Sequence, residues 1–246
     1  MDINKEKYKI KEIPIEVTVL TGLAIRGEKE TFEVGGLDNP VLRVVYKNTK
    51  SNGEIKRIPI IPGSSLKGKI RCELVRKYRL YKEVEKEEEE EEEEDIGEDL
   101  DKDPKIGNKI KRLFGTQARR GRLIFSDLLP TNETLEYWDE LERRDLTFDY
   151  GTETKMENSI VRSSGKAINP RTMERVVVGS VFKGLITYIV ENEGEMQEDL
   201  EFLEEGLELV AKTYLGGCGS RGYGRVKIKI EYDGSTKEFK PGFING

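Results

Sequence analysis

The order of strand-like and helix-like segments along the chain is the feature that most constrains its fold. Residues 13–25 alternate apolar and polar side chains and are rich in β-branched residues, which predicts a strand. Residues 66–82 and 200–214 carry apolar side chains at helical spacing. Further strands are predicted at 41–46, 55–61, 123–129, 180–190 and 225–232, and a short helix at 106–114.

The main elements follow the order strand, helix, strand, strand, helix, strand. This is the ferredoxin-like pattern that RNA-recognition (RRM-like) sheets share. We therefore expect the 246 residues to form a single α+β domain with an RRM-like core and inserted segments. Residues 150–178 are polar, contain Gly151, Gly165 and Pro170, and are expected to form a protruding arm.

The charge of the chain is unevenly distributed. Residues 83–103 contain 15 acidic and two basic side chains, a local charge of −13, and we expect a disordered acidic insertion there. The remainder has 40 basic and 33 acidic residues, a net charge of +7. A basic body favours a polyanionic partner, because phosphate contacts supply most non-specific affinity for nucleic acids.

Several classes of protein are excluded by residue types that the chain lacks. The absence of histidine excludes Ser-His-Asp and Cys-His catalysis and histidine metal sites. Cys72 and Cys218 are too few for a disulfide framework or a zinc site. With no apolar run of membrane-spanning length and no secretory h-region, a cytoplasmic protein without membrane contact is expected.

The segment Gly63–Arg71 (GSSLKGKIR) nearly matches a phosphate-binding loop but has Ile70 where a hydroxyl would hold Mg²⁺. Free N–H groups at a helix start attract anions, and basic side chains follow immediately. A capped helix with solvated lysines is the alternative interpretation, in which Ser64 or Ser65 is the cap. The candidate phosphate-binding residues are Gly63, Ser64, Ser65, Lys67, Lys69 and Arg71.

The segment Gly216–Gly224 (GGCGSRGYG) lets the backbone approach a ligand closely, and Arg221 can pair with a phosphate. From Arg221 onward the chain resembles the RNP1 pattern, with Arg225 and Ile228 in place of aromatic residues. A tight turn before a strand is the alternative. The candidate RNA-binding residues are Gly217, Gly219, Ser220, Arg221 and Tyr223.

Two further features carry candidate residues. The loop Gly35–Pro40 displays Asp38, for which an Asx turn is the simpler explanation on the residues alone. The arm carries Arg162, Arg171 and Arg175 among small and apolar residues, which suits contact with a nucleic acid as well as it suits a solvated loop.

Taken together, these segments resemble the RAMP superfamily of CRISPR proteins, especially the repeated backbone subunits of type III-A (Csm) effector complexes. The resemblance runs in family order along nearly the whole chain. Its matching stretches are Leu20–Leu23, Gly35–Val41, Ile61–Arg71, Phe114–Thr116, Arg122–Asp127, Asn169–Arg171, Glu174–Val176 and Leu215–Gly224.

The resemblance implies that copies of the chain stack along a CRISPR guide RNA beside other Csm-type subunits. The arm at 150–178 would be the family's thumb, which kinks the duplex of guide and target RNA. Asp38 matches the position of the family's target-cutting aspartate and would act with Mg²⁺ or another divalent cation, as metal ligand or as base. The acidic segment 83–103 is not part of the family pattern.

Two competing functions remain from the sequence. One is a non-catalytic RNA-binding scaffold subunit of the same kind of complex. The other is a nucleotide-dependent enzyme that uses Gly63–Lys69 as a phosphate loop, against which Ile70 argues.

Overall fold

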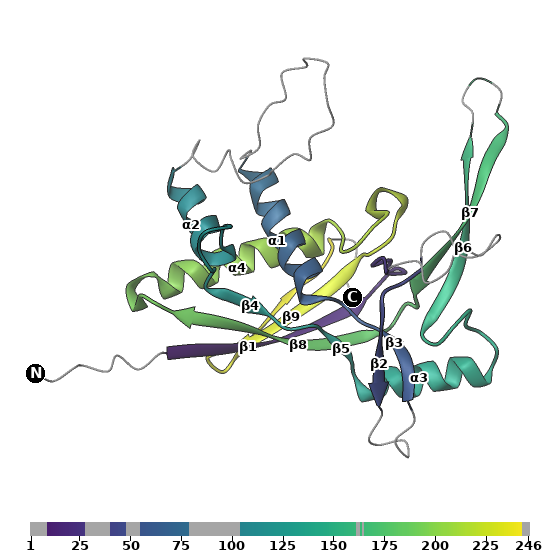
Figure 1. Ribbon diagram of the computed structural model, residues 1–246, viewed down its shortest axis with the longest axis horizontal. Coiled ribbons are helices and arrows are strands. Elements are labelled where there is room, and N and C mark those ends of the chain that lie inside the picture. The colour runs from purple at the N-terminus through teal and green to yellow at the C-terminus, as the bar shows by residue number, and fades with distance from the viewer. Residues whose placement is uncertain are drawn as a thin grey trace, which may run out of the picture.

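The structure is a computed structural model that describes residues 9–27, 40–47, 55–78, 104–160, 163 and 165–242. Its main sheet is antiparallel, with the strand order β10-β9-β1-β8-β4, and β5 also pairs with β8 (Figure 1). These strands are β1 (Lys9–Val19), β4 (Leu123–Phe125), β5 (Leu129–Pro130), β8 (Val181–Val190), β9 (Val226–Tyr232) and β10 (Ser235–Phe239).

Two helices cover one face of this sheet, α1 (Gly63–Lys77) and α4 (Glu193–Lys212), and α2 (Pro104–Phe114) lies beside α1 (Figure 1). Every second side chain at the end of β1 points toward the helices and is buried, as expected for a strand that is covered on one face only. These side chains are Ile13, Ile15, Val17 and Val19. The core is completed by apolar side chains of α1 and α4, which include Leu66, Ile70, Leu74, Leu203, Leu207 and Val210.

The predicted strands and helices are confirmed with shifted ends. The first strand ends at Val19 rather than at residue 25, and α4 begins at Glu193, seven residues before the predicted start at Leu200. Two elements were not predicted, β10 and the helix α3 (Asn132–Arg143). In α3, Trp138 is fully buried and its Nε1 donates to Ser180 Oγ at 2.9 Å, whereas the neighbouring Tyr137 is partly exposed.

Two hairpins stand apart from the main sheet. The strands β2 (Arg43–Lys47) and β3 (Ile55–Pro59) form one, and β6 (Thr152–Ile160) and β7 (Ala167–Val176) form the other. The β6–β7 hairpin lies within residues 150–178, where the arm was expected, and projects from the body of the molecule (Figure 1). The acidic segment 83–103 lies outside the described residues.

The close approach of α1 and α4 depends on Gly206, and substitution of this residue tests the packing of the core. A Cβ at Gly206 would lie 2.5 Å from Ile70 Cγ2, whereas a Cβ at Gly68, on the exposed side of α1, would meet no atom within 4 Å. Gly68→Ala should stabilise the protein by up to about 1 kcal/mol through helix propensity. Gly206→Ala gains the same propensity but should lose about 1–3 kcal/mol to overpacking.

Thermal denaturation of both variants measures the difference. We expect Gly206→Ala to unfold at a lower temperature than Gly68→Ala. Equal midpoints for the two variants would contradict the close crossing of the helices.

Candidate nucleic-acid interface

The start of α1 is capped from a distant part of the chain. The N–H of Gly63 donates to Asp127 Oδ1 at 2.9 Å, and a Cβ at Gly63 would lie 2.5 Å from the carbonyl oxygen of Phe125. The N-cap residue is Pro62, which makes no side-chain hydrogen bond, so the predicted cap at Ser64 or Ser65 is wrong. Ser64 is exposed and Ser65 half-buried, and no described residue accepts a hydrogen bond from either N–H.

Tyr214 brings α1 and the glycine loop (residues 216–224) together. Lys69 Nζ lies 3.6 Å from the centroid of the Tyr214 ring and forms an ion pair with Glu73. On the loop side, Gly219 packs so closely on this ring that a Cβ would lie 2.0 Å from Tyr214 Cγ. The two predicted phosphate-binding segments therefore meet, and Lys69 is held at their junction.

The glycine loop is fixed by backbone hydrogen bonds to the segment after β1. Gly217 N–H donates to the carbonyl of Ala24 at 2.8 Å, and Gly224 N–H donates to the carbonyl of Gly22 at 3.1 Å. Cys218 has a φ of 59°, a left-handed conformation that is uncommon for a residue with a Cβ. Gly217 is half-buried and Ser220 is exposed, which leaves the outer edge of the loop accessible to a ligand.

Tyr223 joins the glycine loop to the base of the β6–β7 hairpin. Its buried ring has Arg175 Cζ at 5.1 Å and Lys155 Nζ at 4.8 Å from the centroid. Arg221 Nη1 donates to Glu157 Oε2 at 2.8 Å, and Arg175 Nε donates to Glu153 Oε1 at 2.8 Å. Both arginines, predicted to bind RNA, thus hold the hairpin against the loop.

A buried carboxylate fixes part of the stem, which we define as residues 23–27 and 40–43 and which flanks the segment with Asp38. Glu174 in β7 accepts the N–H of Val41 at 2.7 Å and the Thr152 hydroxyl at 2.7 Å, and it pairs with Arg43. Burial by itself would raise the pKa of Glu174, but these hydrogen bonds, led by that from Arg43, hold the pKa below its ordinary value.

The same stem lies against the glycine loop and the hairpin. Gly27 N–H donates to the carbonyl of Pro40 at 3.0 Å, which closes the two ends of the segment around Asp38. The carbonyl of Ala24, three residues before Gly27, accepts a hydrogen bond from the N–H of Gly217. Leu23 forms a β-bridge with Val176 of the hairpin. The stem therefore lies at the junction of both elements, although Asp38 and Arg162 themselves lie outside the described residues.

Three basic side chains of α1 and of the loop after α2 form no ion pair with any described residue. They are Lys67 and Arg71, one helical turn apart on α1, and Arg120 in the loop between α2 and β4. Burial and the positive charges of Arg71 and Arg120 lower the pKa of Lys67. The Nε of Arg71 is buried and has no hydrogen-bond partner in the described part of the chain.

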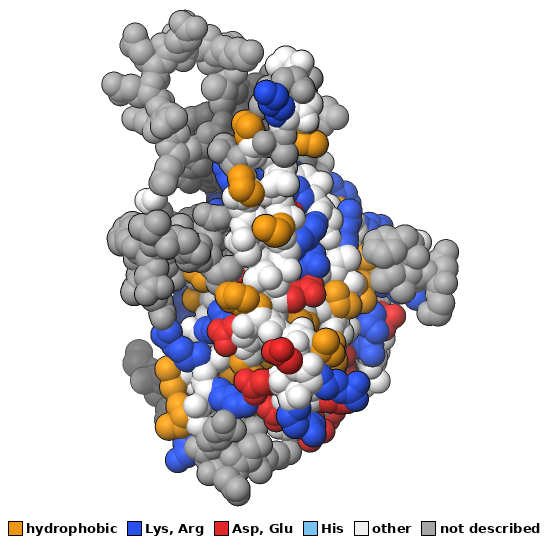
Figure 2. All heavy atoms as spheres, turned by 90° about the vertical axis from the view of Figure 1, so that its right-hand side faces the viewer, with side chains coloured by type: hydrophobic (Ala, Val, Ile, Leu, Met, Phe, Trp, Pro, Cys, Tyr) orange, Lys and Arg blue, Asp and Glu red, His pale blue; other side chains and the backbone are white. Residues whose placement is uncertain are grey.

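The hairpin presents a surface of mixed character. Hydrophobic side chains run up the hairpin, and lysine and arginine side chains lie along one flank of it (Figure 2). Met156, Ile160 and Ile168 are exposed, and so is Arg171, which has no ion pair with a described residue. Such a surface can contact both bases and phosphates.

The described residues do not form a metal centre. In the ranges given above, no three His, Cys, Asp or Glu side chains are grouped closely enough to hold a metal ion. No described helix is long and apolar enough to cross a membrane.

An antiparallel sheet backed by helices, with a helix start that packs against a glycine loop and basic side chains that have no ion pair with a described residue, defines an α+β protein suited to bind a polyanion. Residues 16–227 match the family model of the RAMP superfamily. Because this match spans most of the chain, the protein belongs to the RAMP superfamily.

Individual relatives share this similarity over most of their length. The protein named CRISPR system Cms endoribonuclease Csm3 from Enterococcus italicus is 36% identical over 220 residues, which cover 88% of each chain. The protein of the same name from Methanocaldococcus jannaschii is 37% identical over 235 residues, covering 92% of this chain and 81% of the relative.

A solved structure supports the fold. A chain in the cryo-EM structure of the type III-B Cmr-beta complex bound to cognate target RNA superimposes with a TM-score of 0.52 at 15% identity. The match covers 94% of the present chain, which spans only 61% of the length of that chain. At this identity the likeness concerns the fold alone.

Sequence reasoning missed four residues of the interface: Tyr214, Glu174 as the anchor of the stem, Arg120 and Arg26. Arg26 is exposed at the stem, with its Nε 3.9 Å from the position of a Cβ at Gly217. The adjacent arginines at 119 and 120 were a visible signal, but only the fold shows that Arg119 pairs with Glu191 whereas Arg120 has no ion pair with a described residue.

The buried Glu174 yields a prediction about stability and pH. Glu174→Gln leaves Arg43 without its main counter-ion, so the free energy of unfolding at pH 7 should fall by about 3 kcal/mol. Asp149 Oδ2, 3.1 Å from Arg43 Nη2, remains as a counter-ion in the variant and offsets part of this loss of stability. Because the folded pKa of Glu174 lies below the ordinary 4.5, the carboxylate stabilises the protein above that pH and the benefit is lost as pH falls.

Urea denaturation of the wild type and the variant at several pH values measures this difference. The gap between them should narrow as pH falls below 4.5 toward the lower pKa of the folded state, because the unfolded chain binds a proton in this range that the folded carboxylate does not. The control Glu153→Gln, which breaks a partly exposed pair with Arg175, should cost only about 0–1 kcal/mol. A Glu174→Gln variant as stable as this control would show that the carboxylate does not hold the stem.

Proposed function

We propose that the protein is a guide-RNA-binding backbone subunit of a type III-A CRISPR interference complex and cleaves target RNA within that complex. Its relatives at 36–37% identity are named as Csm3 endoribonucleases. The observation that carries the proposal is the junction of α1, the glycine loop, the hairpin and the stem of the Asp38 loop. Three elements predicted to contact RNA and the residues that flank the predicted catalytic segment are thus neighbours in the fold.

Guide RNA would lie along the start of α1 and the outer edge of the glycine loop. The N–H groups of Ser64 and Ser65, which have no acceptor among the described residues, and the charges of Lys67 and Arg71 suit phosphate oxygens. At Gly217 and Ser220 the RNA could approach the protein backbone closely. Gly63 and Gly219 let the backbone pack against Phe125 and Tyr214, and this packing shapes the surface. Lys69, Arg175, Arg221 and Tyr223 would act mainly by holding this surface together.

The β6–β7 hairpin would act as the thumb. Its exposed apolar side chains can wedge between nucleotides, and Arg171 can contact a phosphate. Copies of the chain would repeat along the guide next to other Csm-type subunits, in the cytoplasm. The order of β9, β1, β8 and β4, with α1 and α4 in the intervening connections, supports an RRM-like core for the domain.

Cleavage would depend on Asp38 and on the geometry of the bound RNA. The thumb would displace one nucleotide so that its 2′-hydroxyl aligns with the adjacent phosphate. The Asp38 carboxylate would accept the hydroxyl proton as the 2′-oxygen bonds to phosphorus, and the bond from phosphorus to the 5′-oxygen would break, which leaves a 2′,3′-cyclic phosphate and a 5′-hydroxyl protonated by water. Most of the rate enhancement would come from this alignment, since positioned reactants can gain about 7–11 kcal/mol. A requirement for Mg²⁺ or another divalent cation is part of the proposal, but the described residues form no site for it.

The alternative of a nucleotide-dependent enzyme conflicts with the structure. The segment Gly63–Lys69 is helical from its first residue, so it forms no loop that could cradle phosphates. Ile70, at the position of the Mg²⁺-binding hydroxyl, is fully buried in the core. The non-catalytic scaffold remains the competing function, and cleavage assays distinguish it.

The Asp38→Asn variant tests the catalytic proposal. Assembled with guide RNA, it should bind target RNA as the wild type does, while its cleavage rate should fall by at least about 100-fold because the proton acceptor is lost. Mapping and timing of target cleavage, with and without EDTA, measures the effect.

The matched control is Asp233→Asn, at the end of β9 remote from the glycine loop, where a φ of 49° also suits asparagine. It should cleave normally. A wild-type assembly that binds but never cleaves would establish the scaffold function, and an active Asp38→Asn assembly would remove Asp38 from the chemistry.

A further inference from the structure

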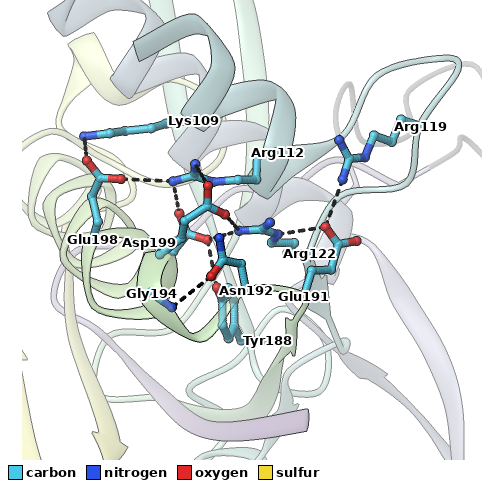
Figure 3. A network of polar contacts seen from close by, with 11 residues as sticks. Lys109, Arg112, Arg119, Arg122, Tyr188, Glu191, Asn192, Gly194, Glu198 and Asp199 are labelled. Atoms are coloured by element: carbon cyan, nitrogen blue, oxygen red, sulfur yellow. Dashed lines mark hydrogen bonds and ion pairs between the residues drawn. The ribbon is translucent and has the colours of Figure 1, made fainter. Parts of the chain in front are cut away.

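The ion pairs of this protein differ in how readily an arginine could exchange its carboxylate for a ligand. Arg122 is buried in the charge network between β8, α2 and α4 (Figure 3). Its guanidinium donates to three carboxylates, those of Glu191 at 3.0 Å, Glu195 at 2.7 Å and Asp199 at 2.8 Å. A ligand would have to replace all three contacts, and a buried charge that loses its partner is costly. This network is therefore a structural anchor.

The ion pair between the glycine loop and the β6–β7 hairpin is of the opposite kind. Arg221 Nη1 donates to Glu157 Oε2 at 2.8 Å, and 53% of the Arg221 side chain is exposed. No other described carboxylate pairs with Arg221. A phosphate can therefore reach the guanidinium from solvent and has a single carboxylate to displace.

The backbone of the glycine loop is fixed independently of this ion pair. Arg221 N–H donates to the carbonyl of Cys218 at 2.9 Å, and Gly222 N–H donates to the carbonyl of Gly219 at 3.1 Å. Gly222 has a φ of 85°, a conformation that glycine adopts without steric cost. The Arg221 side chain can thus change its partner while its backbone stays in place.

Glu157 would keep a counter-ion if Arg221 turned to a phosphate. Its Oε1 lies 3.6 Å from Lys155 Nζ, on the same face of β6. Arg171 stands directly opposite Glu157 in the register of β6 and β7, so its positive charge lies on that face as well. Because Arg221 is exposed and Glu157 retains these cations, the exchange should cost little more than the loss of an exposed ion pair.

We propose that Glu157 competes with RNA phosphates for Arg221 and thereby links the hairpin to the occupancy of the glycine loop. In the free protein the pair holds β6 against the loop. In the RNA complex Arg221 turns to a phosphate, and Glu157 remains with Lys155. The inference rests on the proposed RNA-binding function and adds to it a residue that restrains RNA binding and releases the hairpin when RNA is bound.

A double-mutant cycle tests the exchange, with the wild type, Glu157→Gln, Arg221→Gln and the double variant. Glu157→Gln should lower the Kd for single-stranded RNA by about twofold to fivefold, because RNA no longer has to break an ion pair of the exposed kind. In the Arg221→Gln background the same substitution should lower Kd by a smaller factor. The control Glu191→Gln, which breaks the exposed pair with Arg119, should have the same small effect in both backgrounds.

Fluorescence anisotropy of labelled, unstructured RNA with the full chain measures Kd, and thermal denaturation shows that each variant is folded. Glu157→Asp keeps the charge but shortens the reach toward Arg221, so it should also lower Kd, and it replaces Glu157→Gln in the cycle if that variant unfolds. A higher Kd for Glu157→Gln, or a decrease by the same factor in both backgrounds, would overturn the competition. Failure of the wild type to bind RNA at low salt would instead contradict the proposed function itself.

Discussion

One buried carboxylate joins the parts of the molecule on which the interface depends. Glu174 is fully buried in β7 and binds Val41 and Arg43 of the stem and Thr152 of β6. An ion pair that loses one buried partner costs several kcal/mol, so the stem and the hairpin cannot separate at low cost. The residues that flank the Asp38 segment are thereby held beside the element proposed to deform the RNA.

The basic residues of the interface fall into two groups with different roles. Lys69, Arg175 and Arg221 are paired with carboxylates or lie against aromatic rings, and they join α1, the glycine loop and the hairpin. Lys67 and Arg71, together with Arg120 and Arg171, have no such partner among the described residues. The first group builds the surface, and the second leaves its charge available to a polyanion.

Predictions from the sequence succeeded where the pattern was local. Alternation and helical spacing located the strands and helices of the sheet, because burial on one face imposes those periods. The start of α4 was missed since its first turns are acidic and polar, and the cap of α1 was assigned wrongly because Asp127, 64 residues away, supplies it. The glycine loop and the α1 segment were identified, but not Tyr214, which brings them together.

The amino-acid sequence by itself determined the order of the elements and the motifs of the RAMP superfamily, because both are read from residues close together in the chain. It also excluded histidine chemistry, because composition alone decides that. Only the tertiary structure decided which cations remain unpaired. Arg221 meets Glu157 across 64 residues and Arg119 meets Glu191 across 72, whereas Arg120 meets no carboxylate among the described residues. Partners so distant in sequence are brought together only by folding, so no local pattern could distinguish Arg119 from Arg120.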